Sequence, residues 1–148
     1  MLVKSYAAAV QGISATVITI EVNCTKGIQF FLVGLPDVAV RESHERIISA
    51  LQVSGYKFPR NRIVINMAPA DIRKEGSSYD LPLAIGILAA AEELDASRLG
   101  HYMMMGELSL DGSLKPVKGI LPIAIKAREE GFKGFIVCTN IAQLFIFS

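Results

Sequence analysis

The sequence predicts a single domain of the α+β class with α/β-type layering, in which strands and helices interleave along the chain. Two kinds of segment predict it. Thr16–Val22 is rich in β-branched residues with a partial alternation of polarity, as in a strand, whereas Leu81–Ala91 is apolar nearly all round, as in a buried helix. A length of 148 residues and a hydrophobic content of 51% are enough to bury one core.

Strands dominate the first quarter of the chain. Residues 3–10 are expected to form a strand, and Thr16–Val22 and Ile28–Val33 form two more. The last two are separated by the turn residues of Asn23–Gly27, so residues 14–33 predict a hairpin.

A helix is expected to begin after Asp37, whose carboxylate is a suitable N-cap, and to end at Gly55, which suits the C′ position. Small and apolar side chains recur on one face of this helix: Val40, Ser43, Ile47, Ala50, Leu51 and Ser54. A strand, Arg62–Met67, follows between Pro59 and Pro69.

The middle of the chain combines a polar segment with an apolar one. Ala70–Asp80 is expected to be a surface loop, and Asp80 is a candidate N-cap for the helix that follows. Pro82 fits the first turn of that helix. Residues 81–94 are apolar nearly all round until two glutamates near the end, which predicts a central, buried helix.

The last third alternates strands with one further helix. Tyr102–Leu110 predicts a strand, Asp111-Gly112 is a strong turn signal, and Ser113–Val117 is expected to pair back as a hairpin. Gly119–Gly131 predicts a helix, and Gly134–Cys138 predicts a short strand.

Composition narrows the classes of function. The 15 Lys and Arg residues are balanced by 14 Asp and Glu residues, so a net charge of +1 predicts no strong global attraction to nucleic acid or to acidic membranes. The longest apolar stretch, Leu81–Ala91, is about half the ~20 residues that a membrane helix needs. Cys24 and Cys138 indicate buried thiols in a reducing compartment, although their spacing alone leaves a disulfide open. We therefore expect a cytoplasmic location.

The sequence contains no standard pattern for catalysis, cofactors or metals. A P-loop requires GxxxxGK[ST], and Gly112–Lys115 has the wrong order. His44, expected on the solvent-facing side of its helix, and His101 have no ligand-spaced neighbours. There is no GxSxG elbow, and Ser77-Ser78 are expected to be turn residues. A Ser–Lys dyad stays open, because a buried serine beside a desolvated lysine could come from many positions.

One basic cluster is a candidate contact surface for DNA or a partner protein. Its members flank the strand at 62–67: Lys57, Arg60, Arg62, Arg73 and Lys74. With Tyr56, Phe58 and Tyr79 interleaved, these cations could bind a phosphate backbone while aromatic faces accept bases. An ordinary solvated rim, with Tyr56 and Phe58 in the core, explains the same residues, and a protein–protein contact through Arg73 is a third reading.

A long run of residues resembles the N-terminal domain of magnesium-chelatase-like AAA+ ATPases, the YifB/ComM group linked to natural competence. The resemblance covers about residues 2–137. It is carried by Val33-Gly34-Leu35-Pro36-Asp37, Arg41-Glu42-Ser43, Glu45-Arg46, Ser54-Gly55, Pro59, Arg62, residues 66–76 and Asp80-Leu81-Pro82-Leu83-Ala84.

A second stretch, Gly106–Gly112 with Pro116 and the helix up to Gly131, is similar to the proteolytic domain of Lon and the C-terminal domain of RadA. The resemblance implies the fold of ribosomal protein S5 domain 2, a mixed sheet with helices packed on one side. In Lon a serine follows Asp-Gly-Pro, and the matching position here is Leu83. The position that matches the partner lysine is Leu121, so this resemblance implies that hydrocarbon fills a lost dyad.

The first resemblance implies that residues 1–137 form the Lon-like domain and that the AAA+ motor, with its ATP and Mg²⁺, lies outside this chain. Residues 138–148 are unusually apolar and are expected to form an atypical tail. The implied function is a non-catalytic accessory domain that helps a hexameric ring assemble or engage DNA, with no small-molecule substrate. Two alternatives remain open: a Lon-type peptidase with a relocated dyad, and an RNA-binding module of the S5 type.

Overall fold

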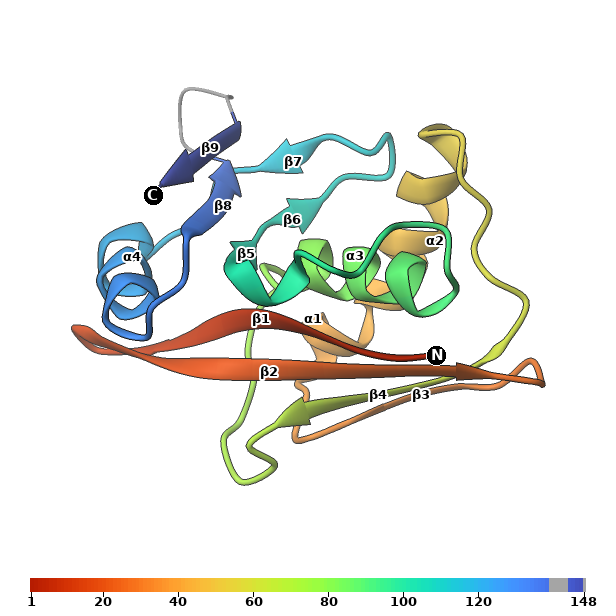
Figure 1. The fold of residues 1–148 in the computed structure, drawn as a ribbon, viewed down its shortest axis with the longest axis horizontal. Coiled ribbons are helices and arrows are strands. Elements are labelled where there is room, and N and C mark those ends of the chain that lie inside the picture. Colours follow the sequence, from red (N-terminus) through yellow and green to blue (C-terminus); the bar gives the residue numbers. More distant parts are fainter. Residues whose placement is uncertain (139–143, 148) are drawn as a thin grey trace.

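The computed structural model describes residues 1–138 together with the backbone of residues 144–147 (Figure 1). Its strands are β1 Leu2–Gln11, β2 Ser14–Thr25, β3 Phe30–Val33, β4 Arg62–Ala68, β5 Tyr102–Met105, β6 Glu107–Leu108, β7 Leu114–Lys115, β8 Gly134–Cys138 and β9 Leu144–Phe147. Its helices are α1 Val38–Arg41, α2 Ser43–Val53, α3 Asp80–Ala90 and α4 Ile120–Glu129, with a single 3₁₀ turn at Leu99–His101.

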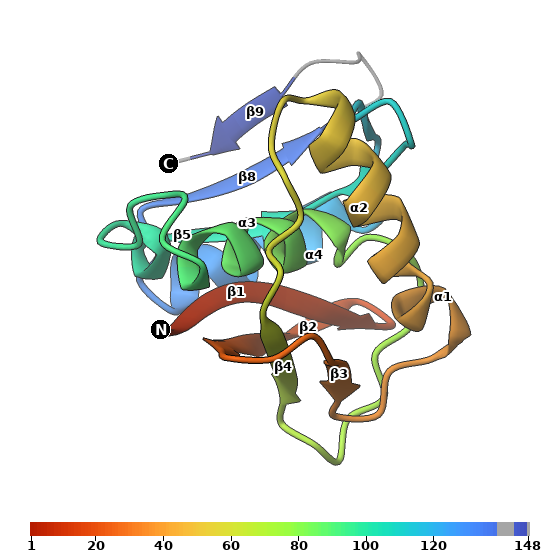
Figure 2. The ribbon, with the colours of Figure 1, turned by 90° about the vertical axis from the view of Figure 1, so that its right-hand side faces the viewer.

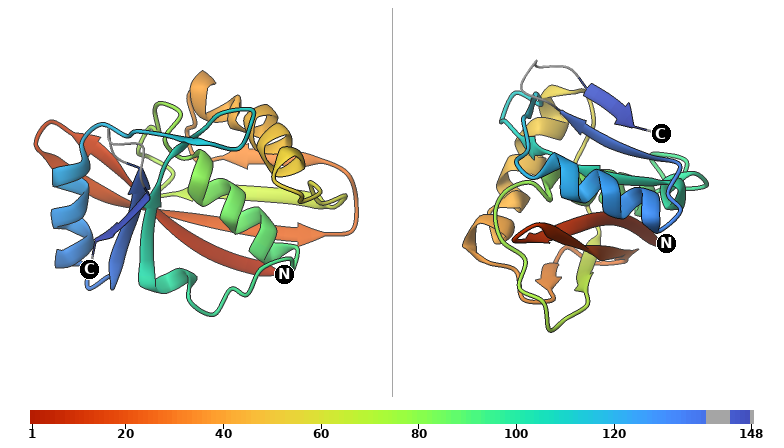
Figure 3. Two further views of the ribbon diagram at one scale, coloured as in Figure 1. Left: turned by 90° about the horizontal axis from the view of Figure 1, so that it is seen from above. Right: turned by 90° about the vertical axis from the view of Figure 1, so that its left-hand side faces the viewer.

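Seven strands form one mixed sheet in the order β3-β4-β2-β1-β5-β8-β9, and β6 and β7 form a separate two-stranded hairpin. The sheet is strongly twisted, with β3 and β4 at one side and β8 and β9 at the other (Figure 2). Helices α3 and α4 lie over the long strands β1 and β2, as the view from above shows (Figure 3). The predicted class, a mixed sheet with helices on one side, is confirmed.

The two longest strands form a regular antiparallel hairpin. Ten residue pairs join β1 to β2, from Leu2–Asn23 to Gln11–Ser14. The tight turn between them uses Gly12 at φ +62°, a conformation that glycine adopts without steric cost. In β2 the alternate residues Ile18, Ile20, Val22 and Cys24 are buried, which explains the alternation in the sequence.

The hairpin predicted for residues 14–33 is wrong. Strand β4 lies between β2 and β3, pairing antiparallel with β2 and parallel with β3. The turn residues after β2 do reverse the chain, but the inner position is taken by β4, whose Ile63, Ile65 and Met67 are completely buried. Turn signals indicate where a chain reverses and not which strand becomes its neighbour.

Helix α3 is the centre of the core, as predicted. Nine of its eleven residues are buried, and it packs on β1 and β2. Gly86 allows this approach, because a Cβ there would lie 2.9 Å from a methyl group of Val22. The helix ends at Ala90 and not near residue 94, and Glu92 follows at φ +64°.

The helical segment after Asp37 begins as predicted but consists of two helices. Asp37 Oδ1 accepts a 2.8 Å hydrogen bond from the Val40 amide and caps α1. Glu42 separates α1 from α2, and the segment ends before Gly55, which has φ +89°. The second oxygen of Asp37 accepts a hydrogen bond from the Gly76 amide at 3.1 Å, so the same cap also holds the loop before α3.

The strand predicted at 102–110 is divided at Gly106. The Gly106 amide donates to the Ser78 carbonyl at 2.7 Å, and the Leu81 amide donates to the Gly106 carbonyl at 3.0 Å. These bonds tie the chain to the first turn of α3, so β5 ends in the main sheet and β6 begins the separate hairpin.

The C-terminal segment adds two strands to the sheet. β8 pairs parallel with β5, and β9 pairs antiparallel with β8. The limits predicted for the domain and its tail, 1–137 and 138–148, stay predictions. Cys24 and Cys138 are both buried, as expected. Within the described residues, no helix has the length and apolar character needed to cross a bilayer.

Candidate functional site

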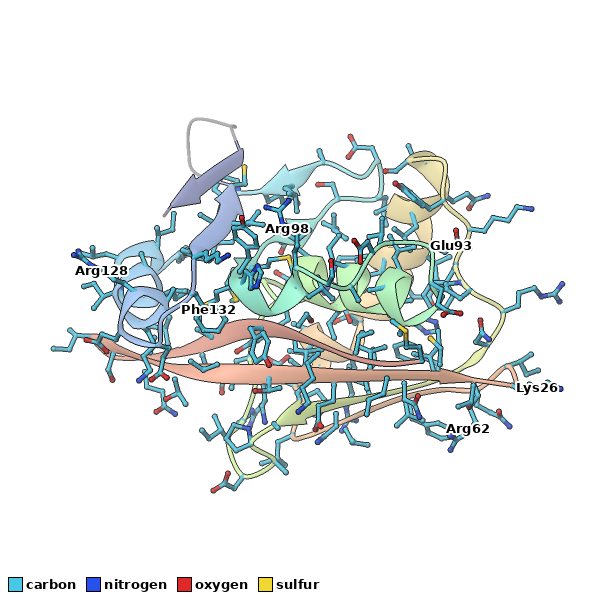
Figure 4. All side chains as sticks on the ribbon, in the orientation of Figure 1. Lys26, Arg62, Glu93, Arg98, Arg128 and Phe132 are labelled. Carbon is cyan, nitrogen blue, oxygen red and sulfur yellow. The ribbon has the colours of Figure 1, made fainter. Side chains whose placement is uncertain are left out.

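Four exposed cations gather where two loops meet at one end of the sheet. The loop from β2 to β3 contributes Lys26, the loop from α2 to β4 contributes Lys57 and Arg60, and Arg62 is the first residue of β4. The two loops are joined by the pairing of Thr25 with Arg62 at the strand ends. Figure 4 shows Lys26 and Arg62 at this end of the molecule. We call these four residues the basic end.

An open pocket of about 310 Å³ lies at the same end and has aromatic walls. The rings of Phe30 and His44 stack, with their centroids 3.9 Å apart and an interplanar angle of 2°. Phe58 completes the group, its ring centroid 5.2 Å from that of His44. Arg60 and Asn61 also line the pocket. We call it the aromatic pocket.

His44 is half-buried in this ring cluster, so its expected solvent-facing position is wrong. Burial lowers the pKa of its imidazole below the ordinary value, and the nearby Glu45 carboxylate counters part of that effect. The cluster could not be recognised in the sequence, because Phe30 comes from β3 and Phe58 from the loop before β4.

The structure separates Arg73 and Lys74 from the other predicted contact residues. They follow the far end of β4, and the six residue steps from Arg62 to Ala68 span ~20 Å of extended chain. Arg73 is exposed and pairs with Glu75 at 3.3 Å. Lys74 is completely buried, so its ammonium group cannot reach a ligand at the surface, and its predicted role as a surface contact is wrong.

Lys74 instead holds the polar loop against the turn after β3. Its ammonium donates to the carbonyl of Gly34 at 2.6 Å and to the carbonyl of Pro69. Its backbone forms two more bonds, from its amide to the Leu35 carbonyl at 3.0 Å and from the Asp37 amide to its carbonyl at 2.9 Å. Burial lowers the pKa of the Lys74 amine, with Asp71 opposing that shift. The predicted surface loop is thus anchored at its middle.

The two positions that the Lon resemblance assigned to a lost dyad have different environments. Leu83 is 1% exposed within α3, whereas Leu121 is 70% exposed on α4. The expectation that both leucines fill one site with hydrocarbon is therefore wrong. Lys126, the next lysine along α4, pairs with Glu130 at 3.0 Å. Among the described residues, no serine hydroxyl hydrogen-bonds to a lysine amine.

A buried ion pair occupies the N-terminus of α3. Asp80 was predicted to cap this helix, but it is the first helical residue, and its carboxylate binds Arg46 of α2 in two places, at 2.6 and 2.9 Å. The Leu108 amide donates to the same carboxylate at 3.0 Å. Burial raises the pKa of Asp80, and the hydrogen bonds from Arg46 and Leu108 offset part of that rise.

Glu107 of β6 extends this network toward the surface. It accepts a hydrogen bond from the Ser77 hydroxyl and pairs with Lys115 of β7 at 3.3 Å. Both interactions lower the pKa of Glu107, the bond from Ser77 most. The acidic groups here are thus occupied in fixing the β6–β7 hairpin to α3. In the part of the chain that the structure describes, no three His, Cys, Asp or Glu residues cluster as metal ligands would.

Comparison with known proteins gives consistent matches. Residues 20–140 match the family model described as subunit ChlI of Mg-chelatase. The chain is 44% identical over 133 residues to YifB of Escherichia coli, covering 89% of this chain and 26% of YifB. It is 46% identical over 139 residues to the competence protein ComM of Haemophilus influenzae, covering 93% of this chain and 27% of ComM.

A weaker match supports the layering of the fold. The chain is 32% identical over 95 residues to Lon protease 2 of Bacillus subtilis, covering 64% of this chain and 17% of that protease. This match is consistent with the layering of ribosomal protein S5 domain 2 that the sequence implied. The chain spans about a quarter of the length of YifB and ComM.

Proposed function

This chain belongs to the family of subunit ChlI of Mg-chelatase, and we propose that it is a non-catalytic accessory domain through which a magnesium-chelatase-like AAA+ ATPase engages DNA. The resemblance to the YifB/ComM group is confirmed by identities of 43–46% over most of the chain. One of these relatives is named a competence protein, which supports a role in processing incoming DNA. ATP and Mg²⁺ then act in other parts of the whole protein.

The basic end is the observation that carries this proposal. Its four cations are exposed, and none of them forms an ion pair with a carboxylate in the described part of the chain. Unpaired surface cations attract phosphate groups and release the counterions around them. The balanced charge of the chain makes any such attraction local.

A salt series tests the proposal. Binding of a short fluorescent DNA to this chain is measured by anisotropy at several salt concentrations. The slope of log affinity against log salt is negative, and each lost phosphate contact should make it shallower by about 0.7–0.9. We expect Lys57→Ala and Arg60→Ala each to do so. Arg128→Ala is the matched control, because Arg128 lies at the opposite end of the molecule (Figure 4).

The variant Arg73→Ala tests whether the DNA contact surface includes Arg73 or is limited to the basic end. A reduced slope in Arg73→Ala would extend the contact to the far end of β4, as the sequence predicted. An unchanged slope would confine it to the basic end. DNA binding without salt dependence in the unaltered chain, or no binding, would refute DNA engagement by this domain. Tighter binding to RNA than to DNA in the same assay would favour the S5-type module.

The ring is tested in the whole protein, which we expect to be a hexamer of the ATPase. Neutralising Lys57 and Arg60 there should reduce stimulation of ATP hydrolysis by DNA while leaving the basal rate unchanged. Smaller oligomers in the double variant, measured by mass photometry, would show that these residues serve ring assembly and not DNA contact. These two results distinguish DNA from a neighbouring subunit as the partner of Lys57 and Arg60.

The absence of peptidase chemistry is tested with a serine-reactive fluorophosphonate probe. Leucine can neither attack a carbonyl nor take up a proton, and the Lon resemblance assigns Leu83 and Leu121 to the positions of the serine and the lysine. We therefore expect no labelling of the chain. One labelled serine, with the label abolished by a single Ser→Ala change, would establish the relocated dyad instead.

A further inference from the structure

The aromatic pocket adjoins the basic end through Arg60, and this combination gives it a specific chemistry. Phe58 follows Lys57 in the chain, and Arg60 is both a member of the basic end and part of the pocket wall. A ligand that contacts Arg60 from solvent is therefore beside the rings. The site offers positive charge at its rim and aromatic carbon inside.

The volume of the pocket is large enough for a planar ring. Its volume of about 310 Å³ is that of about ten water molecules at roughly 30 Å³ each, which exceeds the volume of one nucleobase. Phe30, His44 and Phe58 all line the pocket, and each is half-buried. Base–aromatic stacking contributes about 1–3 kcal/mol per base and tolerates any base, because all bases have a π-face.

Two amides complete the wall. Gln29 and Asn61 line the pocket, and Asn61 is held in place by donating to the Thr25 carbonyl at 3.2 Å. Side-chain amides carry both a donor and an acceptor, which match the edge groups of a base.

We propose that the aromatic pocket takes one unpaired nucleobase of a single strand, while the basic end holds the neighbouring phosphates. This rests on the proposed DNA engagement and specifies its substrate. In a duplex the faces of every base are covered by stacked neighbours, so a base enters the pocket only where the strand is open or frayed. The domain thereby selects single-stranded over double-stranded DNA.

The experiment compares three ligands on the unaltered chain: a short oligothymidine strand, an abasic strand of equal length and a duplex of equal length. All three carry the same backbone charge chemistry, but only the first offers accessible bases. We expect the oligothymidine to bind about 5- to 150-fold more tightly than the abasic strand, which corresponds to stacking of one base.

A matched pair of variants locates the effect. Phe58→Ala should remove most of the preference for oligothymidine and leave the salt dependence unchanged. Phe132→Ala is the control, because Phe132 is also half-buried in a tilted ring contact, with Tyr6, but lies away from the basic end (Figure 4). Arg60→Ala should weaken all three ligands and reduce the salt dependence.

The outcomes separate this inference from the proposed function. Equal affinity for oligothymidine and the abasic strand, with salt dependence intact, would overturn the base pocket and leave DNA engagement standing. Salt-dependent binding to none of the three would overturn both. Thymidine monophosphate that binds as tightly as the strand would show that the pocket serves free nucleotides. An acidic, phenylalanine-containing peptide that displaces the strand and binds more tightly would assign the pocket to a protein partner.

Discussion

The buried Arg46–Asp80 pair provides a sharp test of what holds the domain together. Asp80→Asn keeps the size of the side chain, but it removes the negative charge and replaces one of the two oxygens that accept hydrogen bonds from Arg46 and Leu108 with an NH2 donor. The guanidinium of Arg46 is then left without its partner in a site where the Asp80 side chain is 1% exposed. Glu75→Gln makes the same chemical change in the Arg73–Glu75 pair, whose side chains are 69% and 70% exposed.

Burial decides the expected difference between these variants. Removing one partner of a buried pair costs about 3–5 kcal/mol, and we expect about 3 kcal/mol because the Arg46 side chain retains 21% exposure. At about 2–4 °C per kcal/mol for a chain of this size, the melting temperature of Asp80→Asn should fall by about 6–12 °C. An exposed pair contributes about 0–1 kcal/mol, so Glu75→Gln should melt within about 4 °C of the unaltered chain.

The assay is thermal unfolding followed by circular dichroism at pH 7.5, supported by urea titration. Equal m-values in the three proteins would confirm that the same surface unfolds in each. If Asp80→Asn lost no more stability than Glu75→Gln, the network between α2, α3 and β6 would not stabilise the fold through its buried charge, and our reasoning would be refuted.

Three further predictions concern single side chains. The pKa of His44 is lowered in the folded state, so the unfolded chain binds more protons than the folded chain as pH falls below about 6.5. The free energy of unfolding should therefore decline at low pH. His44→Phe should reduce this decline, measured as the difference between urea titrations at pH 7.5 and 5.5. Gly34→Ala should lower the free energy of unfolding by at least ~3 kcal/mol, because the new Cβ would lie 2.2 Å from the Met67 carbonyl oxygen. A Cβ at Gly12 would meet no atom within 4 Å, so Gly12→Ala should lower it by only ~1 kcal/mol. Equal melting temperatures of the two variants would contradict this. Leu83→Ala should lower the free energy of unfolding by ~2–5 kcal/mol, whereas Leu121→Ala should lower it by less than ~0.5 kcal/mol. The reverse order in urea titrations would contradict the burial of Leu83 and the exposure of Leu121.

Sequence reasoning found most elements of this fold because local signals determine them. The β-branched run in β2, the Asp37 cap and the uniformly apolar α3 each depend on residues close together in the chain. The partner of β3 could not be found in this way, because it depends on which of two apolar strands occupies the inner position of the sheet. Strand pairing is a property of the whole sheet.

The candidate site shows the same limit more sharply. A lysine in a polar segment is expected at the surface, yet Lys74 is buried because two backbone carbonyls from distant segments accept its hydrogen bonds. His44 is half-buried because rings from β3 and from the loop before β4 enclose it. The sequence did identify Lys57, Arg60 and Arg62, since they are close neighbours, and it missed Lys26 and the pocket between the two loops.

The enclosure of Lys74 has a consequence for chemical footprinting. An acylating reagent that modifies exposed amines can reach Lys26 and Lys57, but it encounters the Lys74 amine only after the segment around Pro69 has separated from the Gly34 turn. The rate at which Lys74 is acylated therefore measures how often the hydrogen bonds from its amine to Gly34 and Pro69 open. A reporter of local opening is already present in the chain, without any added label.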